Sequence, residues 1–318
     1  MAYLYDGHDD DRKVNPPGGS LCPPPVGRGR LFRWSLISVP FPFPFPFPFP
    51  FPFPFPLPPS RRDQTPPMTA PLTIPKHPDY EGPDAHVLRG VIAYNRHGGY
   101  CVPRSSIHRP CAQTILAGQV FEPPTVAALE HHGRHGDIVH AGTYFGDMLP
   151  AAARACGPER LVWACEPNRE NFRCASLTVA LNGLTNVRLH HGALGDRGGL
   201  ATLLVSSPAG EALGGRSRVV EPGSAAADTT YEVPMLRIDD LVPTDRPVAL
   251  IQLDVERQEQ HALSGALATI RRCLPAIIVE TLPDDAWITT NLAPLGYRRA
   301  GMVGPNSLLV AGPGADLS

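Results

Sequence analysis

The chain has 318 residues, a formal net charge of −2 and seven cysteines. Lys and Arg are not concentrated in any run, so the sequence lacks the basic patch with which proteins contact nucleic-acid phosphates, and we expect no nucleic-acid partner. The cysteine number is odd and no Cys-x-x-Cys pair is present. This pattern is typical of reduced thiols in the cytoplasm rather than of a disulfide framework.

Eight Phe-Pro dyads at residues 41–56 hold eight of the twelve phenylalanines. Proline removes a backbone donor and biases the preceding residue towards extended conformations, so this run predicts no helix, no central strand and no membrane span. The acidic start at residues 1–11 does not suit a signal peptide. Two interpretations stay open for residues 1–67: a proline-rich docking segment, or a mis-annotated, disordered extension upstream of a start at Met68.

The remainder, about 250 residues, is long enough for one α/β domain with a sizeable core. We expect an N-terminal helical cap at residues 68–132 and the main domain at residues 133–318. Within the cap, residues 84–132 predict a helix, a Gly-rich turn, a loop and a second helix.

The main domain opens with a buried strand at residues 138–141, a tight turn from Gly142 to Gly146 and a helix from about Asp147. Glycine lacks a Cβ, so the backbone can approach a ligand and adopt a positive φ. The free amides at the start of the following helix point towards such a ligand. A second apolar run, residues 161–165, ends at Glu166, where a carboxylate can accept ribose hydroxyls. The glycine turn and Glu166 together predict a binding site, or cradle, for a nucleotide cofactor.

A helix follows with Asn168 as its N-cap, and a third strand around Val187 leads to the sequence GALGD at residues 192–196. The polar, Gly/Ser/Ala-rich residues 206–230 predict a mobile loop, either a lid or a tolerated insertion.

Two further apolar runs, residues 248–254 and 276–280, end in Asp254 and Glu280, as buried parallel strands do before a crevice. Residues 296–311 predict a final antiparallel hairpin. Strands alternating with helices indicate a doubly wound, mostly parallel, Rossmann-like sheet of seven strands.

Two cofactors compete for the cradle. The NAD-binding fingerprint is G-x-G-x-x-G, whereas this chain has G-x-x-x-G. S-adenosylmethionine (SAM) fits better, with its ribose at Glu166, its adenine at the 192–194 turn and its methionine end at the glycine turn. The expected cofactor-binding residues are Gly142, Thr143, Gly146, Glu166, Asn168, Gly192, Ala193 and Leu194.

Several ordered motifs resemble the FkbM-like family of class I SAM-dependent methyltransferases, over roughly residues 122–280. They are GDIVHAGTYFGD, ACEPN, LNGLTNV before GALGD, LRIDDL, DVERQEQHAL and IIVE. Two positions depart from the family pattern. His140 replaces an acid that helps to hold the amino end of the cofactor, and Arg257 replaces the glycine of D-V-E-G.

The resemblance implies in-line attack of a substrate oxygen on the SAM methyl group, with catalysis mainly by positioning. Asp254 and Glu256 are the candidate general bases. Arg257, His261 and Glu280 are expected to contact substrate. Carboxylates also suit Mg²⁺, and Asp254, Glu256, His261 or Glu280 would be its ligands, but we predict a site without metal.

The sequence thus favours a cytoplasmic SAM-dependent O-methyltransferase that acts on a hydroxyl of a small molecule or sugar, without a membrane partner. Because His140 and Arg257 depart from the family, a catalytically silent SAM-binding or scaffold protein is the alternative. An NAD-dependent dehydrogenase is third. Oligomeric state, and transfer to oxygen rather than nitrogen, are not fixed by the sequence.

Overall fold

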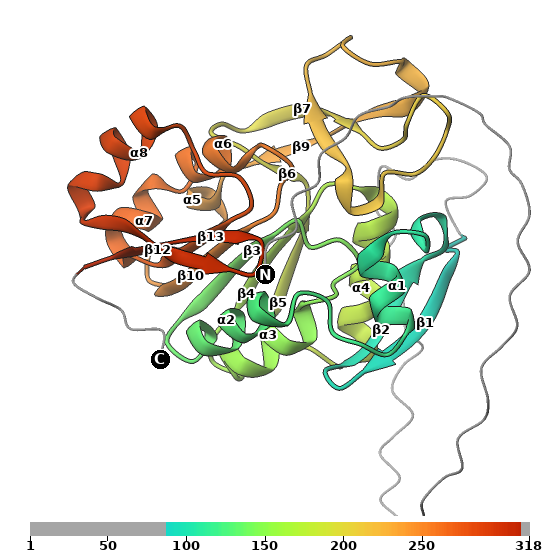
Figure 1. Ribbon diagram of the computed structural model, residues 1–318, viewed down its shortest axis with the longest axis horizontal. Helices are drawn as coiled ribbons and strands as arrows, with labels where there is room; N and C mark the ends of the chain where they lie inside the picture. The colour runs from blue at the N-terminus through green and yellow to red at the C-terminus, as the bar shows by residue number, and fades with distance from the viewer. Residues whose placement is uncertain (1–86, 313–318) are drawn as a thin grey trace, which may run out of the picture. The chain divides into compact units, whose positions relative to one another are not determined.

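A seven-stranded sheet forms the centre of the protein, in the order β12-β13-β11-β10-β3-β4-β5 (Figure 1). The computed structural model describes residues 87–312, so the predictions for the Phe-Pro repeat and for a start at Met68 lie outside the described residues. The strands of this sheet are β3 (Asp137–Ala141), β4 (Val162–Glu166), β5 (Val187–His191), β10 (Val248–Leu253), β11 (Ala276–Val279), β12 (Tyr297–Val303) and β13 (Asn306–Ala311). The first five pair in parallel, and β13 pairs antiparallel with β11 and β12. The predicted fold and its terminal hairpin are confirmed.

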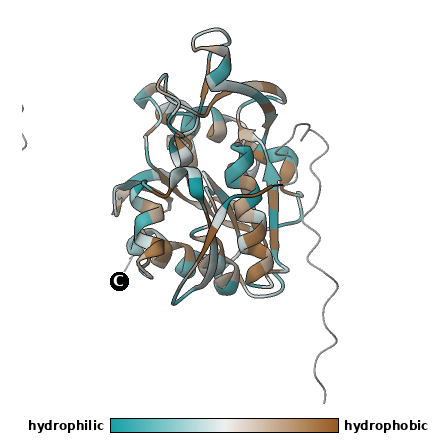
Figure 2. Cartoon of the chain, turned by 90° about the vertical axis from the view of Figure 1, so that its right-hand side faces the viewer, coloured by the Kyte–Doolittle hydropathy of each residue, from teal (hydrophilic) through white to brown (hydrophobic). Residues whose placement is uncertain are grey.

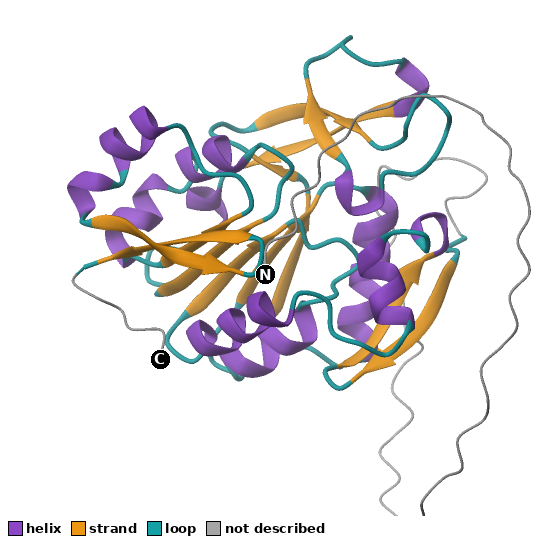
Figure 3. Cartoon of the chain, in the orientation of Figure 1, coloured by secondary structure: helices purple, strands orange, loops and turns teal. Residues whose placement is uncertain are grey.

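Helices cover both faces of the sheet (Figure 3). One face packs against α2 (Pro123–Gly133), α3 (Leu149–Cys156) and α4 (Arg169–Leu181). The other packs against α5 (Ile238–Leu241), α6 (Glu259–Ser264), α7 (Leu267–Cys273) and α8 (Asp285–Asn291). Every residue of β3 and β4 is buried, as both faces of a parallel sheet must be. Hydrophobic segments accordingly lie along the strands and the helices that pack on them (Figure 2).

The strand order reverses beside β3. The chain runs from β3 to β4 to β5 in one direction, while β10 lies on the other side of β3. In open α/β sheets such a reversal leaves a crevice at the carboxyl ends of the two adjoining strands, because their connections leave in opposite directions. The crevice therefore lies where β3 and β10 end.

Asn168 is the N-cap of α4, as the sequence predicts. Its Oδ1 accepts hydrogen bonds from the backbone amides of Glu170 at 3.0 Å and Asn171 at 3.2 Å, two groups that have no partner within the helix. The helix that follows β4 thus begins at a fixed point next to Glu166.

The first helix predicted for residues 84–132 is wrong. The structure has an antiparallel hairpin there, β1 (Gly90–Asn95) and β2 (Gly98–Pro103), followed by a 3-10 turn (Arg104–Ser106) and α1 (Pro110–Leu116). The β-branched and aromatic residues of this stretch favour strands, and β2 packs on α4, where the amide of Cys101 donates to Thr178 Oγ1 at 3.0 Å. The boundary between a cap and the main domain stays a prediction.

The predicted mobile loop at residues 206–230 is wrong in part, because it contains a strand of a second sheet with the order β6-β9-β7-β8. Its strands are β6 (Ala193–Leu194), β7 (Gly199–Leu204), β8 (Arg218–Val220) and β9 (Thr230–Leu236). Short 3-10 turns lie at Gly214–Arg216, Ala227–Thr229 and, before β12, Ala293–Leu295. Strand β8 has only three residues, too few to show an alternating pattern. Among residues 87–312, no helix is both long and apolar enough to cross a membrane.

Candidate active site

The glycine turn after β3 lies directly against the end of β10. Gly142 has φ 79°, and a Cβ at this position would overlap the carbonyl oxygen of Asp254. Only glycine fits such a backbone contact without displacing β10. The turn therefore brings the two strand ends of the crevice together.

Glu166 at the end of β4 holds this turn in place. The side chain is 3% exposed. Its Oε2 accepts from the amide of Tyr144 at 2.7 Å, and its Oε1 accepts from the amide of Asn168 at 2.9 Å and from Asn171 Nδ2 at 3.2 Å. Burial raises the pKa of Glu166 to about 7, although these hydrogen bonds oppose the shift. The sequence pattern did not reveal this link between the acid and the turn.

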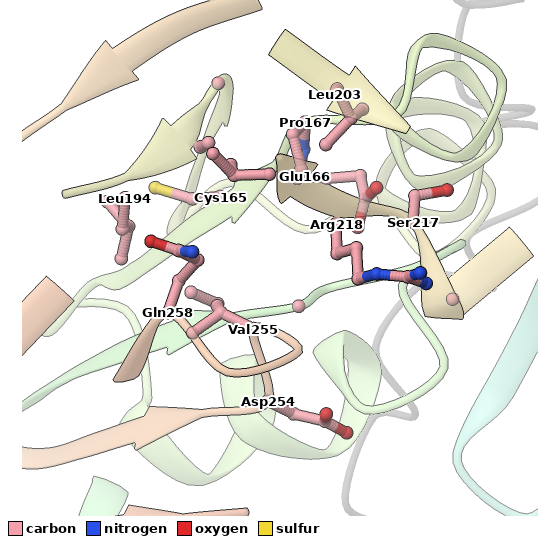
Figure 4. A pocket seen from close by; sticks show the side chains of 16 residues that line it. Cys165, Glu166, Pro167, Leu194, Leu203, Ser217, Arg218, Asp254, Val255 and Gln258 are labelled. Atoms are coloured by element: carbon pink, nitrogen blue, oxygen red, sulfur yellow. The ribbon is translucent and has the colours of Figure 1, made fainter. Parts of the chain in front are cut away.

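Glu166 also lines a pocket of about 440 Å³, counting space open to solvent, which we call the Glu166 pocket (Figure 4). Predicted cofactor residues that line the pocket are Gly142, Glu166, Gly192, Ala193 and Leu194. These residues come from three separate segments of the chain.

The other predicted cofactor residues lie behind the pocket wall. Thr143 is buried and its Oγ1 donates to the carbonyl oxygen of His140 at 3.2 Å. Gly146 has φ 83° and closes the turn. Asn168 caps α4 and donates through Nδ2 to Ser217 Oγ at 3.0 Å. These three residues shape the cradle without lining it.

Residues of the second sheet complete the Glu166 pocket, and the sequence reasoning missed them. Leu203 of β7, Arg218 of β8 and Ser217, which directly precedes β8, line it (Figure 4). Asn171 Nδ2 donates to the carbonyl oxygen of Gly214 at 3.1 Å, which ties this segment to α4. The Val219-Val220 pair was the available signal for a strand here.

The Glu166 pocket suits a nucleoside. Leu194 and Leu203 supply an apolar wall, and the Glu166 carboxylate supplies acceptors. An ionised carboxylate has about four acceptor positions, of which three are used by the donors described above. One position is left for a hydroxyl of a ribose.

A second pocket opens from the same strand ends, and we call it the Glu280 pocket. It measures about 940 Å³, counting space open to solvent, and shares Gly142 and Asp254 with the Glu166 pocket. Glu256 and Glu280, which follow β10 and β11, also line it. One carboxylate oxygen each of Asp254, Glu256 and Glu280 lies within 4.8 Å of the others. The structure thus brings three of the predicted catalytic and substrate residues together.

These carboxyl groups are electrostatically coupled. Burial, followed by the neighbouring Glu280, Glu122 and Glu256 carboxyl groups, raises the pKa of Asp254 to about 8. Burial also raises the pKa of Glu256, with Glu280 contributing, while Arg216 opposes the shift. The Glu280 pocket is therefore an acidic site in which like charges face one another.

His140, one of the two departures from the family pattern, lines the Glu280 pocket. It is 2% exposed and pairs with Gln252 on the neighbouring β10. Its Nδ1 hydrogen-bonds to Oε1 of Gln252, while its Nε2 has no partner among the described residues. Burial lowers the pKa of His140 to about 4, so the ring is neutral at pH 7.

The other departure, Arg257, lies in a left-handed backbone conformation, which glycine adopts without steric cost. Glu256 and Arg257 have φ of 53° and 75°, conformations that are disfavoured for side chains other than glycine. Arg257 is exposed and lines neither pocket. His261 also lines neither pocket, and its Nδ1 lies 3.8 Å from Asp196 Oδ2.

A seven-stranded doubly wound sheet in which β13 inserts antiparallel beside β11, with a glycine turn after β3 and a buried acid ending β4, is the Rossmann-like class I methyltransferase fold. The sequence model of the Methyltransferase FkbM domain matches residues 140–298, half of the chain. The chain belongs to this family, as its motifs predict. Its cofactor is SAM. The family sets aside the dehydrogenase alternative.

Individual known proteins match only part of the chain. The catalytic subunit of tRNA (adenine(58)-N(1))-methyltransferase, TRM61, from Cryptococcus neoformans is 34% identical over 79 residues, which are 23% of this chain and 18% of that subunit's length. Methyltransferase FkbM from Methylobacillus flagellatus is 18% identical with a TM-score of 0.34, covering 55% of this chain and 43% of that one. The O-methyltransferase TomG from Streptomyces achromogenes is 17% identical with a TM-score of 0.37, covering 64% and 86%.

Proposed function

We propose that the protein transfers a methyl group from SAM to a hydroxyl oxygen of a small molecule or sugar. The observation that carries the proposal is that the two pockets meet at Gly142 and Asp254. One pocket offers an apolar wall and a buried acid for the nucleoside, and the other offers carboxylates for an acceptor. The free thiols of the described residues support the cytoplasm as its location.

We assign the adenosine part of the cofactor to the Glu166 pocket. Glu166 has one acceptor position for a ribose hydroxyl, and Leu194 and Leu203 provide the apolar surface for an adenine. The glycine turn, with its close backbone approach at Gly142, holds the methionine end at the passage between the pockets. When bound, SAM supplies an electrophilic methyl group and leaves as the neutral thioether S-adenosylhomocysteine.

The acceptor hydroxyl needs a base, because an alcohol is a poor nucleophile while it keeps its proton. Glu256 lines the acceptor side only, whereas Asp254 lines both pockets. We therefore assign proton removal to a Glu256 oxygen, and to Asp254 the orientation of the acceptor where the pockets meet. Most of the rate would come from this positioning.

The test is calorimetric titration of the full chain with S-adenosylhomocysteine, followed by assays of methyl transfer from labelled SAM to glycosides, polyols and amines. Binding together with transfer to a hydroxyl compound supports the proposal. Transfer to amines alone would overturn the assignment to oxygen. Binding without transfer to any acceptor would favour the silent SAM-binding alternative.

The silent alternative rests on His140 and Arg257. The turn at Glu256 and Arg257 keeps a left-handed backbone without glycine, which supports an intact site rather than a lost one. His140 carries no charge with which to hold the amino end of the cofactor, so that contact must come from other groups at the glycine turn.

A further inference from the structure

The acidic cluster at the ends of β10 and β11 brings three carboxyl groups together in one pocket, and no ion pair within the described residues neutralises them. Asp254, Glu256 and Glu280 each place one oxygen within 4.8 Å of the others. Among the described residues, no Arg or His nitrogen lies within ion-pairing distance of these three carboxyl groups. Ionised carboxylates this close repel one another strongly, and a bound cation, like a shared proton, relieves that repulsion.

An independent feature of the same pocket also indicates a ligand. His140 is almost fully buried, and the hydrogen bond of its Nδ1 to Gln252 Oε1 fixes the ring. Because a carbonyl oxygen only accepts, Nδ1 carries the proton and Nε2 presents a lone pair. That nitrogen has no donor among the described residues, although the residue lines the Glu280 pocket. A buried acceptor without a partner is destabilising, and water on a cation would supply the missing donor.

We propose that the Glu280 pocket binds one hard divalent cation, Mg²⁺ or Mn²⁺, through one oxygen each of Asp254, Glu256 and Glu280, with His140 Nε2 accepting a hydrogen bond from a water on the ion. Carboxylates and water are the ligands that such cations prefer. Ligand oxygens on Mg²⁺ lie about 3 Å apart when adjacent and about 4.2 Å apart when opposite, so the three oxygens, which lie within 4.8 Å of one another, would draw together on the ion. Glu280 is exposed, so its side chain can rotate to allow this.

This site deepens the proposed function and rests on it for its role in the reaction. An acceptor hydroxyl on the cation would lose its proton more readily, because a bound metal lowers the pKa of a coordinated oxygen. A carboxylate that binds through one oxygen keeps its second oxygen free, so Glu256 can still receive that proton. The binding of the ion itself does not require methyl transfer.

The experiment is titration of the full chain with MnCl₂ in the absence of SAM, with free Mn²⁺ followed by electron paramagnetic resonance and Mg²⁺ then added as competitor. We expect one Mn²⁺ per chain, displaced by Mg²⁺. Glu280→Gln is expected to weaken the affinity by at least about tenfold, and His140→Phe, which removes an outer partner of the ion, by about tenfold.

Glu159→Gln is the matched control, because Glu159 is exposed and precedes β4, at the opposite end of the sheet. Glu256→Gln repeats the test should Glu280→Gln not fold. Absence of saturable Mn²⁺ binding, or wild-type affinity in both glutamine variants, would overturn the site. S-adenosylhomocysteine binding, measured on the same samples, tests the proposed function separately.

Discussion

Glu166 Oε2 accepts a hydrogen bond from the backbone amide of Tyr144 at 2.7 Å. The acid at the end of β4 therefore fixes the glycine turn at the end of β3. Glu166 and Tyr144 are 22 residues apart in the chain. Tyr144 itself has φ 53°, a conformation that needs such support. The cofactor acid is thus also a structural part of the cradle.

Replacing Glu166 tests both roles. Glu166→Gln keeps the size of the side chain but turns one acceptor oxygen into a donor, which then faces the Tyr144 or Asn168 amide. We expect S-adenosylhomocysteine affinity to fall by at least about tenfold, because a lost hydrogen bond to a charged group costs about 1.5–3 kcal/mol. Calorimetry measures the affinity, with Glu159→Gln as the matched control. Unchanged affinity would remove Glu166 from the cofactor site.

The raised pKa of Glu166, about 7, predicts a pH dependence of cofactor binding. Below this pH the carboxyl group is protonated and loses its remaining acceptor position, so affinity for S-adenosylhomocysteine should fall as the pH drops from 8 to 6. The slope is at most about tenfold per pH unit for a single group. Calorimetric titrations with S-adenosylhomocysteine between pH 8 and pH 6 should give a pH-independent affinity for Glu166→Gln. If its affinity falls as steeply as that of the wild type, the pH dependence belongs to another group.

The raised pKa of Glu166 also makes the free energy of unfolding depend on pH. Its effect on stability is opposite to its effect on cofactor affinity, because it favours folding at low pH. The folded-state pKa lies above the ordinary value of 4.5, so the folded protein binds the proton more tightly than the unfolded chain. The contribution of Glu166 to the free energy of unfolding is therefore fully present below about pH 4.5 and is lost as the pH rises through about 7. Urea unfolding at pH 5 and pH 8 should show a larger loss of stability at pH 8 in the wild type than in Glu166→Gln, because Asp254 and Asp147, whose pKa values are also raised, titrate in both proteins.

Gly142→Ala should destabilise the protein more than a positive φ alone explains. The added Cβ would overlap the carbonyl oxygen of Asp254, whereas Gly183 has φ 60° with open space around its Cβ position. Gly183→Ala is therefore the matched control and should cost about 1–2 kcal/mol. Urea unfolding measures both. Equal losses would show that the contact between β3 and β10 is not tight.

Asn168→Ala should lower the free energy of unfolding by about 0.5–2 kcal/mol, the usual cost of losing an N-cap. Asn168→Ser keeps a capping oxygen but loses the hydrogen bond from Nδ2 to Ser217. We expect serine to recover most of the stability while cofactor affinity stays reduced, because the second-sheet segment loses an anchor. Urea unfolding and calorimetry separate the two effects. Full recovery of affinity by serine would show that the Ser217 contact does not shape the pocket.

Glu256→Gln should lower kcat for methyl transfer by about 10²–10⁴, the usual contribution of a general base. S-adenosylhomocysteine affinity should stay unchanged, since Glu256 lines only the Glu280 pocket. Steady-state kinetics with an accepted substrate measure kcat. A variant with normal kcat would leave Glu256 without a role in proton removal.

The parallel strands could be predicted from sequence because both of their faces are buried, which produces short unbroken apolar runs such as the one before Asp254. Hairpin β1–β2 was missed, since its short strands carry no clean alternation. Strand β8 was missed for the same reason, and Ser217 and Arg218 with it.

The candidate active site, too, could be predicted from the sequence only in part. Gly142 and Glu166 belong to local motifs, and their roles follow from turn geometry and position at a strand end. His261 was expected to contact substrate from its place in a motif, yet it faces Asp196. Side-chain direction after a strand depends on turn conformation, such as the left-handed pair at Glu256 and Arg257, which a residue list does not show.

By itself the sequence determined the family, the alternation of strands and helices, and the set of acids at the strand ends, because periodicity and local motifs are written along the chain. Only the tertiary structure decided that β10 lies beside β3, so that Gly142 meets Asp254 and the two pockets join there. It also brought His140 into the pocket of the three carboxyl groups. The pairing of β10 with β3 joins residues more than a hundred positions apart, and no local pattern encodes it.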